Sequence, residues 1–121
     1  MKGDPVRNPQ FQTAIIGAGF AGLGAAIKLK ESKLSSFIIF ERSSDVGGTW
    51  RDNTYPGCGC DVPSHLYSYS FERNPSWSRS FSKQPEILDY IRHCSKKYKV
   101  EKHIQYNTEI KNLHFDESKN F

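Results

Sequence analysis

The chain has 121 residues, which limits it to a single domain. Hydrophobic residues make up 36% of it, and eight Phe, six Tyr and two Trp are enough for a buried core, so the composition excludes a disordered chain. A net charge of +4 is compatible with nucleic-acid binding, but the basic residues are scattered, and the densest group falls where a helix should end. We therefore expect no nucleic-acid partner.

The first ten residues, "MKGDPVRNPQ", are polar and contain two prolines. They lack the apolar region of a secretory signal, so we expect residues 1–10 to be a flexible lead. No run approaches the roughly 18 apolar residues of a membrane span, so no transmembrane segment is predicted. Three cysteines without an export signal favour free thiols in a reducing compartment and hence a cytoplasmic location.

The strongest pattern lies near the start of the chain. Residues 11–16 form a short apolar run that predicts a buried parallel strand. Gly17, Gly19 and Gly22 then spell G-x-G-x-x-G, and residues 21–31, rich in Ala, Leu and Lys, predict a helix. Leu23, Ala26, Ile27 and Lys30 share one face of it. A second apolar run, residues 37–40, predicts the next strand. This strand, turn, helix and strand order is the context that the dinucleotide-binding fingerprint requires.

Each glycine has a physical role in such a turn. Gly17 permits the sharp exit from the strand, Gly19 leaves room for a pyrophosphate to approach the backbone, and Gly22 lets the helix pack close to the sheet. The N-terminus of the helix then offers free N–H groups and a partial positive charge to the phosphates. The pattern predicts a diphosphate-binding turn.

Glu41 ends the second strand, 19 positions after Gly22. The fingerprint expects an acid at about this distance, where it accepts hydrogen bonds from the adenosine ribose. The alternative is a surface acid paired with Arg42. An acid here argues against a 2′-phosphate, because two negative groups would meet with no cation between them. FAD or NAD is therefore expected at this site rather than NADP.

Three further segments narrow the choice of cofactor. The segments "GAGFAGL", "FERSSDVGGTW" and "YPGCGCDVPSHLYSYSF", in this order, resemble the N-terminal part of flavin-dependent monooxygenases of the Baeyer–Villiger and flavin-containing types. The resemblance runs from about residue 13 to residue 71 and more loosely to the end. It implies that the first fingerprint binds FAD, that residues 47–50 wrap its diphosphate and ribityl chain, and that the segment ending in Asp61 lies beside the isoalloxazine ring.

The resemblance also implies roles for individual residues. Asp61 would lie on the nicotinamide side of the flavin and help to position an arginine that belongs to a later part of such proteins; the alternative is a turn cap before Pro63. Tyr67 would touch the flavin edge, or else belong to a strand over residues 66–71. Trp50 and Tyr55 offer flat apolar surface, with core packing as the alternative for Trp50. The complete expected cofactor-binding set is Gly17, Gly19, Phe20, Ala21, Gly22, Glu41, Arg42, Gly48, Thr49, Trp50, Asp61, Val62, Tyr67 and Ile110; no catalytic residue is assigned.

The cysteines do not predict a metal site. A structural zinc site needs four ligands, commonly in pairs at C-x₂₋₄-C or H-x₃₋₅-H spacing, whereas Cys58 and Cys60 have only His65 nearby. Their C-x-C spacing also differs from the C-x-x-C of redox pairs. We interpret both as small side chains in a crowded loop packed against the flavin.

The last third of the chain predicts a helix, "PEILDYIRHCSKKYKV", whose apolar stripe is formed by Ile87, Ile91, Cys94 and Tyr98. Short strands are predicted over residues 103–106 and 109–116. They are followed by a hairpin turn, "DESKN", and by the start of a returning strand at Phe121.

The fold class expected is α/β: a partial Rossmann-like FAD-binding domain with a parallel sheet, truncated before its last strands. Residues 11–121 would form the incomplete domain, a fragment of a longer enzyme that exposes one face and one edge of its central strand. The second G-x-G-x-x-G for NADPH is absent from this sequence.

Three hypotheses for function follow. The chain is part of an oxygenase that uses NADPH to reduce FAD and inserts one oxygen atom of O₂ into a ketone, amine or sulfide. Alternatively it is an NAD-dependent dehydrogenase domain, against which the GGTW loop argues. The third hypothesis is a non-catalytic fragment that binds FAD or a partner weakly, or nothing.

Overall fold

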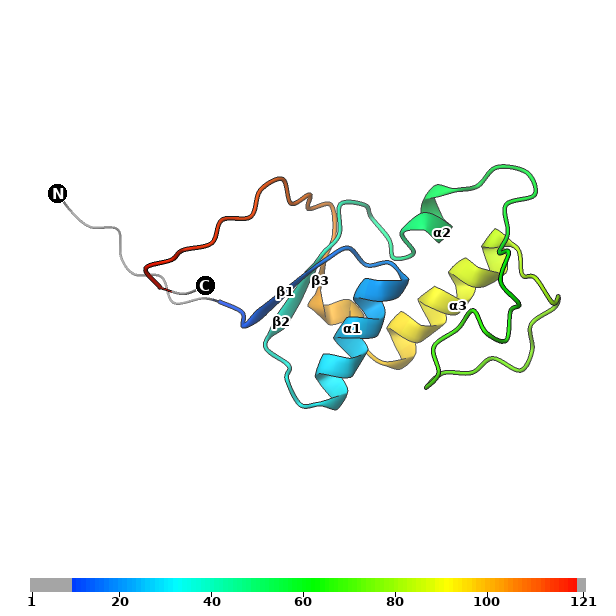
Figure 1. The fold of residues 1–121 in the computed structure, drawn as a ribbon, viewed down its shortest axis with the longest axis horizontal. Coiled ribbons are helices and arrows are strands. Elements are labelled where there is room, and N and C mark those ends of the chain that lie inside the picture. The colour runs from blue at the N-terminus through cyan, green and yellow to red at the C-terminus, as the bar shows by residue number, and fades with distance from the viewer. Residues whose placement is uncertain (1–9, 120–121) are drawn as a thin grey trace.

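The computed structural model describes residues 10–119 (Figure 1). Of the predicted lead over residues 1–10, only residue 10 lies within this range. Phe121, where a returning strand was predicted to start, lies outside it. The element order is β1, α1, β2, α2, α3, a 3₁₀ turn and β3. No helix within residues 10–119 is long and apolar enough to cross a bilayer.

The sheet has three parallel strands in the order β1-β2-β3. β1 (Thr13–Ile16) pairs with β2 (Phe37–Phe40) from end to end, and β2 pairs at its carboxyl end with β3 (Ile104–Gln105). The parallel α/β arrangement and all three strand positions are confirmed. The prediction that the first strand is buried was wrong. Three of its four residues are exposed and Ile16 is 54% exposed, because within residues 10–119 a strand pairs with it along one edge only, that of β2.

Helix α1 (Phe20–Glu31) follows the glycine turn as predicted, one residue earlier than expected. Its buried residues are Leu23, Ala26 and Ile27, and Lys30 extends its ammonium group to the carbonyls of Tyr98 and Lys99. A Cβ at Gly22 would lie 1.9 Å from the Gly17 carbonyl oxygen, a distance that no side chain tolerates. The helix therefore approaches the strand end as closely as its backbone permits.

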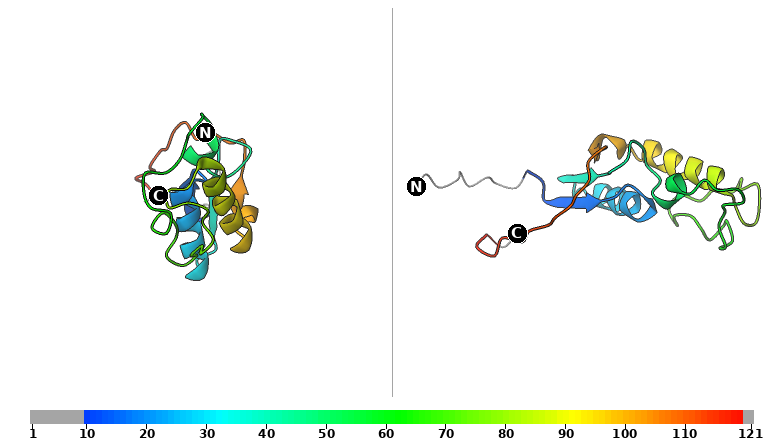
Figure 2. Two further views of the ribbon diagram at one scale, coloured as in Figure 1. Left: turned by 90° about the vertical axis from the view of Figure 1, so that its right-hand side faces the viewer. Right: turned by 90° about the horizontal axis from the view of Figure 1, so that it is seen from above.

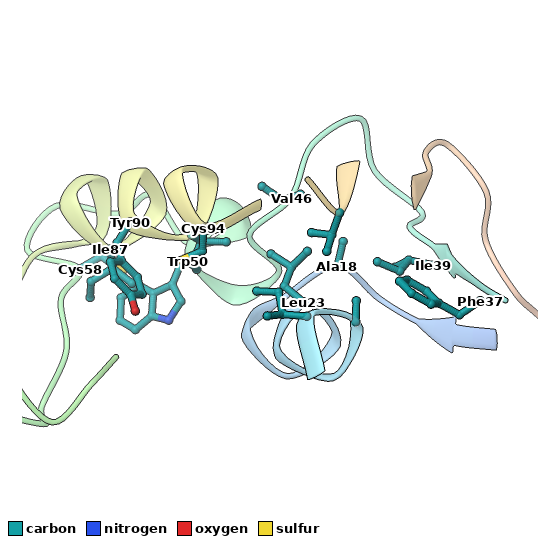
Figure 3. Close-up of a cluster of buried hydrophobic side chains, with 14 residues drawn as sticks. Ala18, Leu23, Phe37, Ile39, Val46, Trp50, Cys58, Ile87, Tyr90 and Cys94 are labelled. Carbon is teal, nitrogen blue, oxygen red and sulfur yellow. The ribbon is translucent and has the colours of Figure 1, made fainter. Parts of the chain in front are cut away.

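Helix α3 (Gln84–Lys97) carries the apolar stripe that its spacing predicted. Ile87, Ile91 and Cys94 are buried and Tyr98 is partly buried. These side chains and those of α1 belong to one cluster that extends from the sheet to the loop around Cys58 (Figure 3). The core thus joins the sheet and α1 to α3. Cys94 is a core residue, as expected.

The segment between α2 (Thr49–Asp52) and α3 contains no strand, so the strand predicted over residues 66–71 was wrong. The alternation behind that prediction survives in the side chains: Tyr67, Tyr69 and Phe71 pack against the core, while Leu66 is 75% exposed. The backbone forms turns because its amides bond locally or to a side chain, as when the Tyr69 N–H donates to the Tyr90 hydroxyl at 2.9 Å.

The predicted strand over residues 109–116 was also wrong. After β3 the chain runs clear of the helices with no regular structure up to a turn at residues 117–119 (Figures 1 and 2). The turn is closed by the Lys119 N–H, which donates to the Asp116 carbonyl, but the strands that would make it a hairpin are absent within residues 10–119. Leu113 and Phe115 are 79% and 60% exposed, because no neighbouring strand within the described residues pairs with this segment.

One buried acid fastens the irregular segment to α3. Glu72 is 9% exposed, and its carboxylate accepts hydrogen bonds from the Lys97 ammonium and from the Tyr98 hydroxyl at 2.8 Å. The bond from Lys97 is the main cause that lowers the pKa of Glu72, ahead of the opposing effect of burial. The ionised carboxylate is therefore the form that the fold stabilises.

We predict that Gly22→Ala lowers the free energy of unfolding by about 3 kcal/mol or more, because the added methyl forces α1 away from β1. Gly19→Ala should cost less than about 1 kcal/mol, since the nearest atom to its Cβ would lie at an ordinary 3.6 Å. Urea denaturation of both variants measures the difference. Equal stability of the two would contradict the close approach.

A second prediction concerns acid stability. The pKa of Glu72 is below its ordinary 4.5 in the folded chain, so its contribution is present above that pH and is lost as the pH falls through the folded-state pKa. Between pH 5 and pH 3 the free energy of unfolding falls as Glu72 is protonated. In Glu72→Gln we expect this fall to be smaller by about 1–2 kcal/mol. The exposed Glu117→Gln is the control, and urea denaturation across this pH range is the measurement. An unchanged pH slope in Glu72→Gln would refute the assignment.

Candidate functional site

The glycine turn has the shape that its sequence predicted. Gly17 adopts φ +96°, and its N–H donates to the Phe40 carbonyl at 2.8 Å, which ties the turn to the end of β2. Gly19 is the N-cap of α1 and has no capping side chain. The N–H groups of the first helical turn have no partner within the helix, so they are available to an anion at this end.

A second glycine loop lies against this turn. Gly48 precedes α2 with φ +52°, and a Cβ built on it would lie 3.2 Å from the Cα of Gly19. A Cβ on Gly19 would in turn lie 3.6 Å from the Cα of Gly48. The two loops therefore meet backbone to backbone, and no side chain separates them.

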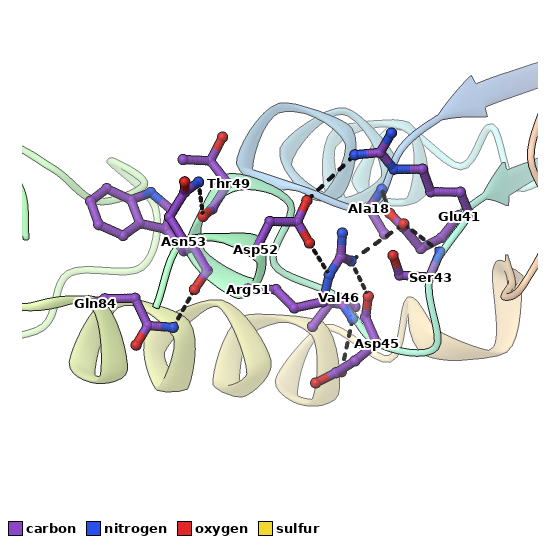
Figure 4. Close-up of polar contacts among 12 residues, drawn as sticks. Ala18, Glu41, Ser43, Asp45, Val46, Thr49, Arg51, Asp52, Asn53 and Gln84 are labelled. Atoms are coloured by element: carbon purple, nitrogen blue, oxygen red, sulfur yellow. Dashed lines mark hydrogen bonds and ion pairs between the residues drawn. The ribbon is translucent and has the colours of Figure 1, made fainter. Parts of the chain in front are cut away.

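Glu41 lies beneath the turn and is 3% exposed. The Ala18 N–H donates to its Oε2 at 2.8 Å and the Ser43 N–H donates to its Oε1 at 2.9 Å (Figure 4). The carboxylate thus faces the glycine turn, as the fingerprint requires. The alternative pair with Arg42 is absent, because Arg42 lies 3.5 Å from Asp52 instead.

Arg51 is a residue of this site that the sequence analysis missed. Its Nη1 lies 3.3 Å from Glu41 Oε1, its Nε donates to Asp52 Oδ1 at 2.9 Å, and it also donates to the Asp45 carbonyl (Figure 4). Partial burial opposes its charge, but the hydrogen bond to Asp52 and the charge of Glu41 outweigh this and raise the pKa of Arg51. No pattern in the sequence pointed to this contact.

Arg51 also changes one argument about the cofactor. We excluded a 2′-phosphate because no cation was expected beside Glu41, and that premise was wrong. The guanidinium is already engaged by two carboxylates and a carbonyl, so it does not offer a free positive charge. The surroundings of Glu41 remain unfavourable to a phosphate.

A pocket of about 400 Å³, here called the Glu41 pocket, opens at the carboxyl ends of β1 and β2. It brings together half of the expected cofactor-binding residues. Its lining also includes Arg51, Asp52, Thr108 and Glu109, which were not predicted. The expected residues that line it are Gly17, Gly19, Glu41, Arg42, Gly48, Thr49 and Ile110.

A second pocket of about 350 Å³, the Trp50 pocket, lies over the N-terminus of α1. It shares Gly17, Gly19 and Thr49 with the Glu41 pocket and adds Phe20, Ala21, Gly22, Trp50 and Tyr67. The Trp50 indole N–H donates to the Tyr67 hydroxyl at 2.9 Å, and the two rings meet edge to face. Trp50 is 8% exposed, so it both packs in the core and lines the pocket.

The remaining expected residues do not join these pockets. Asp61 and Val62 are exposed and line neither pocket, and Tyr55 is 62% exposed. All three belong to the irregular segment after α2. The place of Asp61 and Val62 beside the flavin and the flat surface expected of Tyr55 remain predictions.

The cysteines are free thiols: Cys58 and Cys94 are buried, and Cys60 is partly buried. Cys58 belongs to the core cluster, in agreement with its interpretation as a packing residue. Over the described range 10–119, no three His, Cys, Asp or Glu side chains lie close enough together to hold a metal ion.

Comparison with known proteins places this geometry in a family. Residues 15–94 match the NAD(P)-binding Rossmann-like domain. A Baeyer–Villiger monooxygenase of Pseudomonas aeruginosa is 52% identical over 113 residues, which cover 93% of this chain and 21% of that protein. One of Streptomyces coelicolor is 49% identical over 87% of this chain and 20% of its own length.

Solved structures agree with the sequence relatives. OTEMO in complex with FAD and NADP matches with a TM-score of 0.83 at 32% identity, over 93% of this chain and 22% of that one. The chain thus spans about a fifth of the length of its relatives. It belongs to the family of NAD(P)-binding Rossmann-like domains, and its relatives include Baeyer–Villiger monooxygenases.

Proposed function

We propose that residues 11–121 form an incomplete FAD-binding domain, preceded by a lead over residues 1–10. In this proposal the chain supplies the adenosine and diphosphate part of the FAD site of an NADPH-using monooxygenase, together with residues at the flavin end. The observation that carries the proposal is the bare backbone where Gly19 meets Gly48, directly beside a buried acid, Glu41, that faces the same turn.

The chemistry of the residues fits a dinucleotide. Paired phosphates need backbone N–H donors and no intruding side chains, which the Gly19 and Gly48 loops supply. A ribose needs a hydrogen-bond acceptor, which Glu41 supplies, and a flavin ring needs flat apolar surface, which Trp50 and Tyr67 supply.

Each group of residues has a proposed task. Gly17, Gly19, Phe20, Ala21 and Gly22 hold the diphosphate together with Gly48 and Thr49. Glu41 holds the ribose hydroxyls, Arg42 adds positive charge at the exposed rim of the Glu41 pocket, and the backbone at Ile110 lies at the adenine end. Trp50, Asp61, Val62 and Tyr67 face the flavin end of the cofactor.

The relatives support FAD and NADPH as the cofactors of the complete protein, since one similar structure holds both FAD and NADP. FAD held by these residues would supply the redox chemistry that carries electrons from NADPH to O₂, so that one oxygen atom enters the substrate and the other leaves as water. We propose a ketone as that substrate, because the relatives are Baeyer–Villiger monooxygenases; an amine or a sulfide is the alternative class. The 121 residues alone would bind FAD without catalysing oxygenation. We place the protein in the cytoplasm, where its three free thiols stay reduced.

Titration of FAD with the 121-residue chain tests the proposal. We expect micromolar protein to quench flavin fluorescence, and Gly19→Ala to weaken binding at least about tenfold, because a methyl would occupy the surface that the phosphates approach. Ser35→Thr, which adds a methyl to an exposed loop residue, should bind like the unmodified chain.

Three other results would count against this proposal. Tight binding of NADH without binding of FAD would favour the dehydrogenase domain. Absence of quenching would favour a fragment with no cofactor role of its own. Equal affinity of Gly19→Ala and the unmodified chain would remove the diphosphate from this turn.

A further inference from the structure

We infer that Arg51 is a positioning residue for the adenosine ribose: it holds the Glu41 carboxylate in the orientation in which that carboxylate receives the ribose hydroxyls. This inference rests on the proposed FAD site and adds a residue to it. Arg51 acts through Glu41 and is not assigned a contact with the cofactor.

The carboxylate of Glu41 is held from three parts of the chain. The Ala18 N–H belongs to the glycine turn, the Ser43 N–H follows β2, and the Arg51 guanidinium comes from α2. Two of the three act on Oε1, so among the described residues Oε2 accepts a hydrogen bond from Ala18 alone. Since each carboxylate oxygen has two lone pairs, Oε2 keeps capacity for a further donor, and Glu41 lines the pocket where that donor would arrive.

Arg51 is itself fixed, which a positioning residue must be. Its side chain is 15% exposed, and three acceptors hold it: the Asp45 carbonyl, Asp52 Oδ1 and Glu41 Oε1. A planar guanidinium bound at two of its nitrogens, here Nε and Nη1, cannot rotate freely, unlike a lysine ammonium. Without Arg51, the buried Glu41 carboxylate would keep its two backbone N–H bonds but would lose its contact with α2 and the positive charge that balances its own.

The same contact joins the two loops of the site. Arg51 belongs to α2, which begins directly after Gly48, while Glu41 bonds to the turn that contains Gly19. The ion pair therefore couples the position of the phosphate-binding loop to the orientation of the ribose acid. A merely structural arginine would have no such effect on the recognition of ribose hydroxyls.

The chain also provides a matched control. Arg42 lines the same pocket, but its side chain is 66% exposed and pairs with Asp52 at 3.5 Å. Both arginines add one positive charge to the pocket, and only Arg51 contacts Glu41. If the arginines acted only by attracting phosphate, Arg42→Gln and Arg51→Gln would weaken nucleotide binding alike. If Arg51 orients Glu41, only Arg51→Gln changes the contribution of the ribose hydroxyls.

The test compares the affinities of the 121-residue chain for ADP and for 2′,3′-dideoxy-ADP by isothermal titration calorimetry. The ratio of the two affinities reports the ribose hydroxyls alone. We expect a ratio of about ten or more for the unmodified chain, since hydrogen bonds to a charged group are among the stronger ones. Arg51→Gln should bring the ratio to within about twofold of one while leaving the affinity for the dideoxy nucleotide nearly unchanged.

The other variants complete the test. Arg42→Gln should keep the ratio, and Arg51→Gln should have no further effect on it once Glu41→Gln is present. Arg51→Lys keeps the charge without the guanidinium fork, so an intermediate ratio is expected. Thermal unfolding of each variant shows whether it is folded; if Arg51→Gln is not, Arg51→Lys decides, and an unchanged ratio overturns the inference.

The outcomes separate the inference from the proposed function. If the unmodified chain binds neither nucleotide, the proposed site fails and the inference fails with it. If it binds both, but Arg51→Gln lowers both affinities equally or leaves the ratio intact, the inference alone is overturned and the FAD site stands.

Discussion

The geometry of this chain depends on the closeness of two backbone segments, the start of α1 and the end of β1. With no side chain at Gly22, the helix lies against the Gly17 carbonyl, and a methyl there would stand only 1.9 Å from that oxygen. Burial of Leu23, Ala26 and Ile27 holds the helix down in this position. As a result, the first turn of α1 presents its N–H groups at the carboxyl edge of the sheet, where Glu41 directly follows β2.

The second half of the site is built differently. α2 has only four residues, too few for hydrogen bonds within the helix to position it alone. Side chains do this instead: Gln84 at the start of α3 donates to the Trp50 carbonyl, and Arg51 bonds to the Asp45 carbonyl. Val46 and Trp50 add apolar contacts to the common core. The Gly48 loop is thus held between α3 and the glycine turn, which explains why the two glycine loops meet without intervening side chains.

The parts of the fold that followed from the sequence are those with a local physical signature. Residues close together in the sequence are enough to predict these parts. They are the strands at residues 13–16 and 37–40, the glycine turn, and the helix that carries the stripe of Ile87, Ile91 and Cys94. The predictions failed where partners come from elsewhere in the chain. Residues 66–71 alternate like a strand, but the Tyr90 hydroxyl and local turns take their amides. Residues 109–116 contain apolar side chains at Ile110, Leu113 and Phe115 but have no strand beside them within the described chain. Arg51 looked like an ordinary surface residue, because its role depends on where Glu41 and Asp45 lie after folding.

The short chain distance between Glu41 and its partners has a kinetic consequence. Ala18 and Arg51 lie within one βαβ unit and its following loop, whereas Gln105 must return from beyond α3 to pair with Phe40. Closing a short loop costs less chain entropy than closing a long one, and contacts between near neighbours form sooner. The acid and its arginine are therefore expected to come together before β3 docks against β2, so that the nucleotide cradle precedes the completion of the sheet beside it.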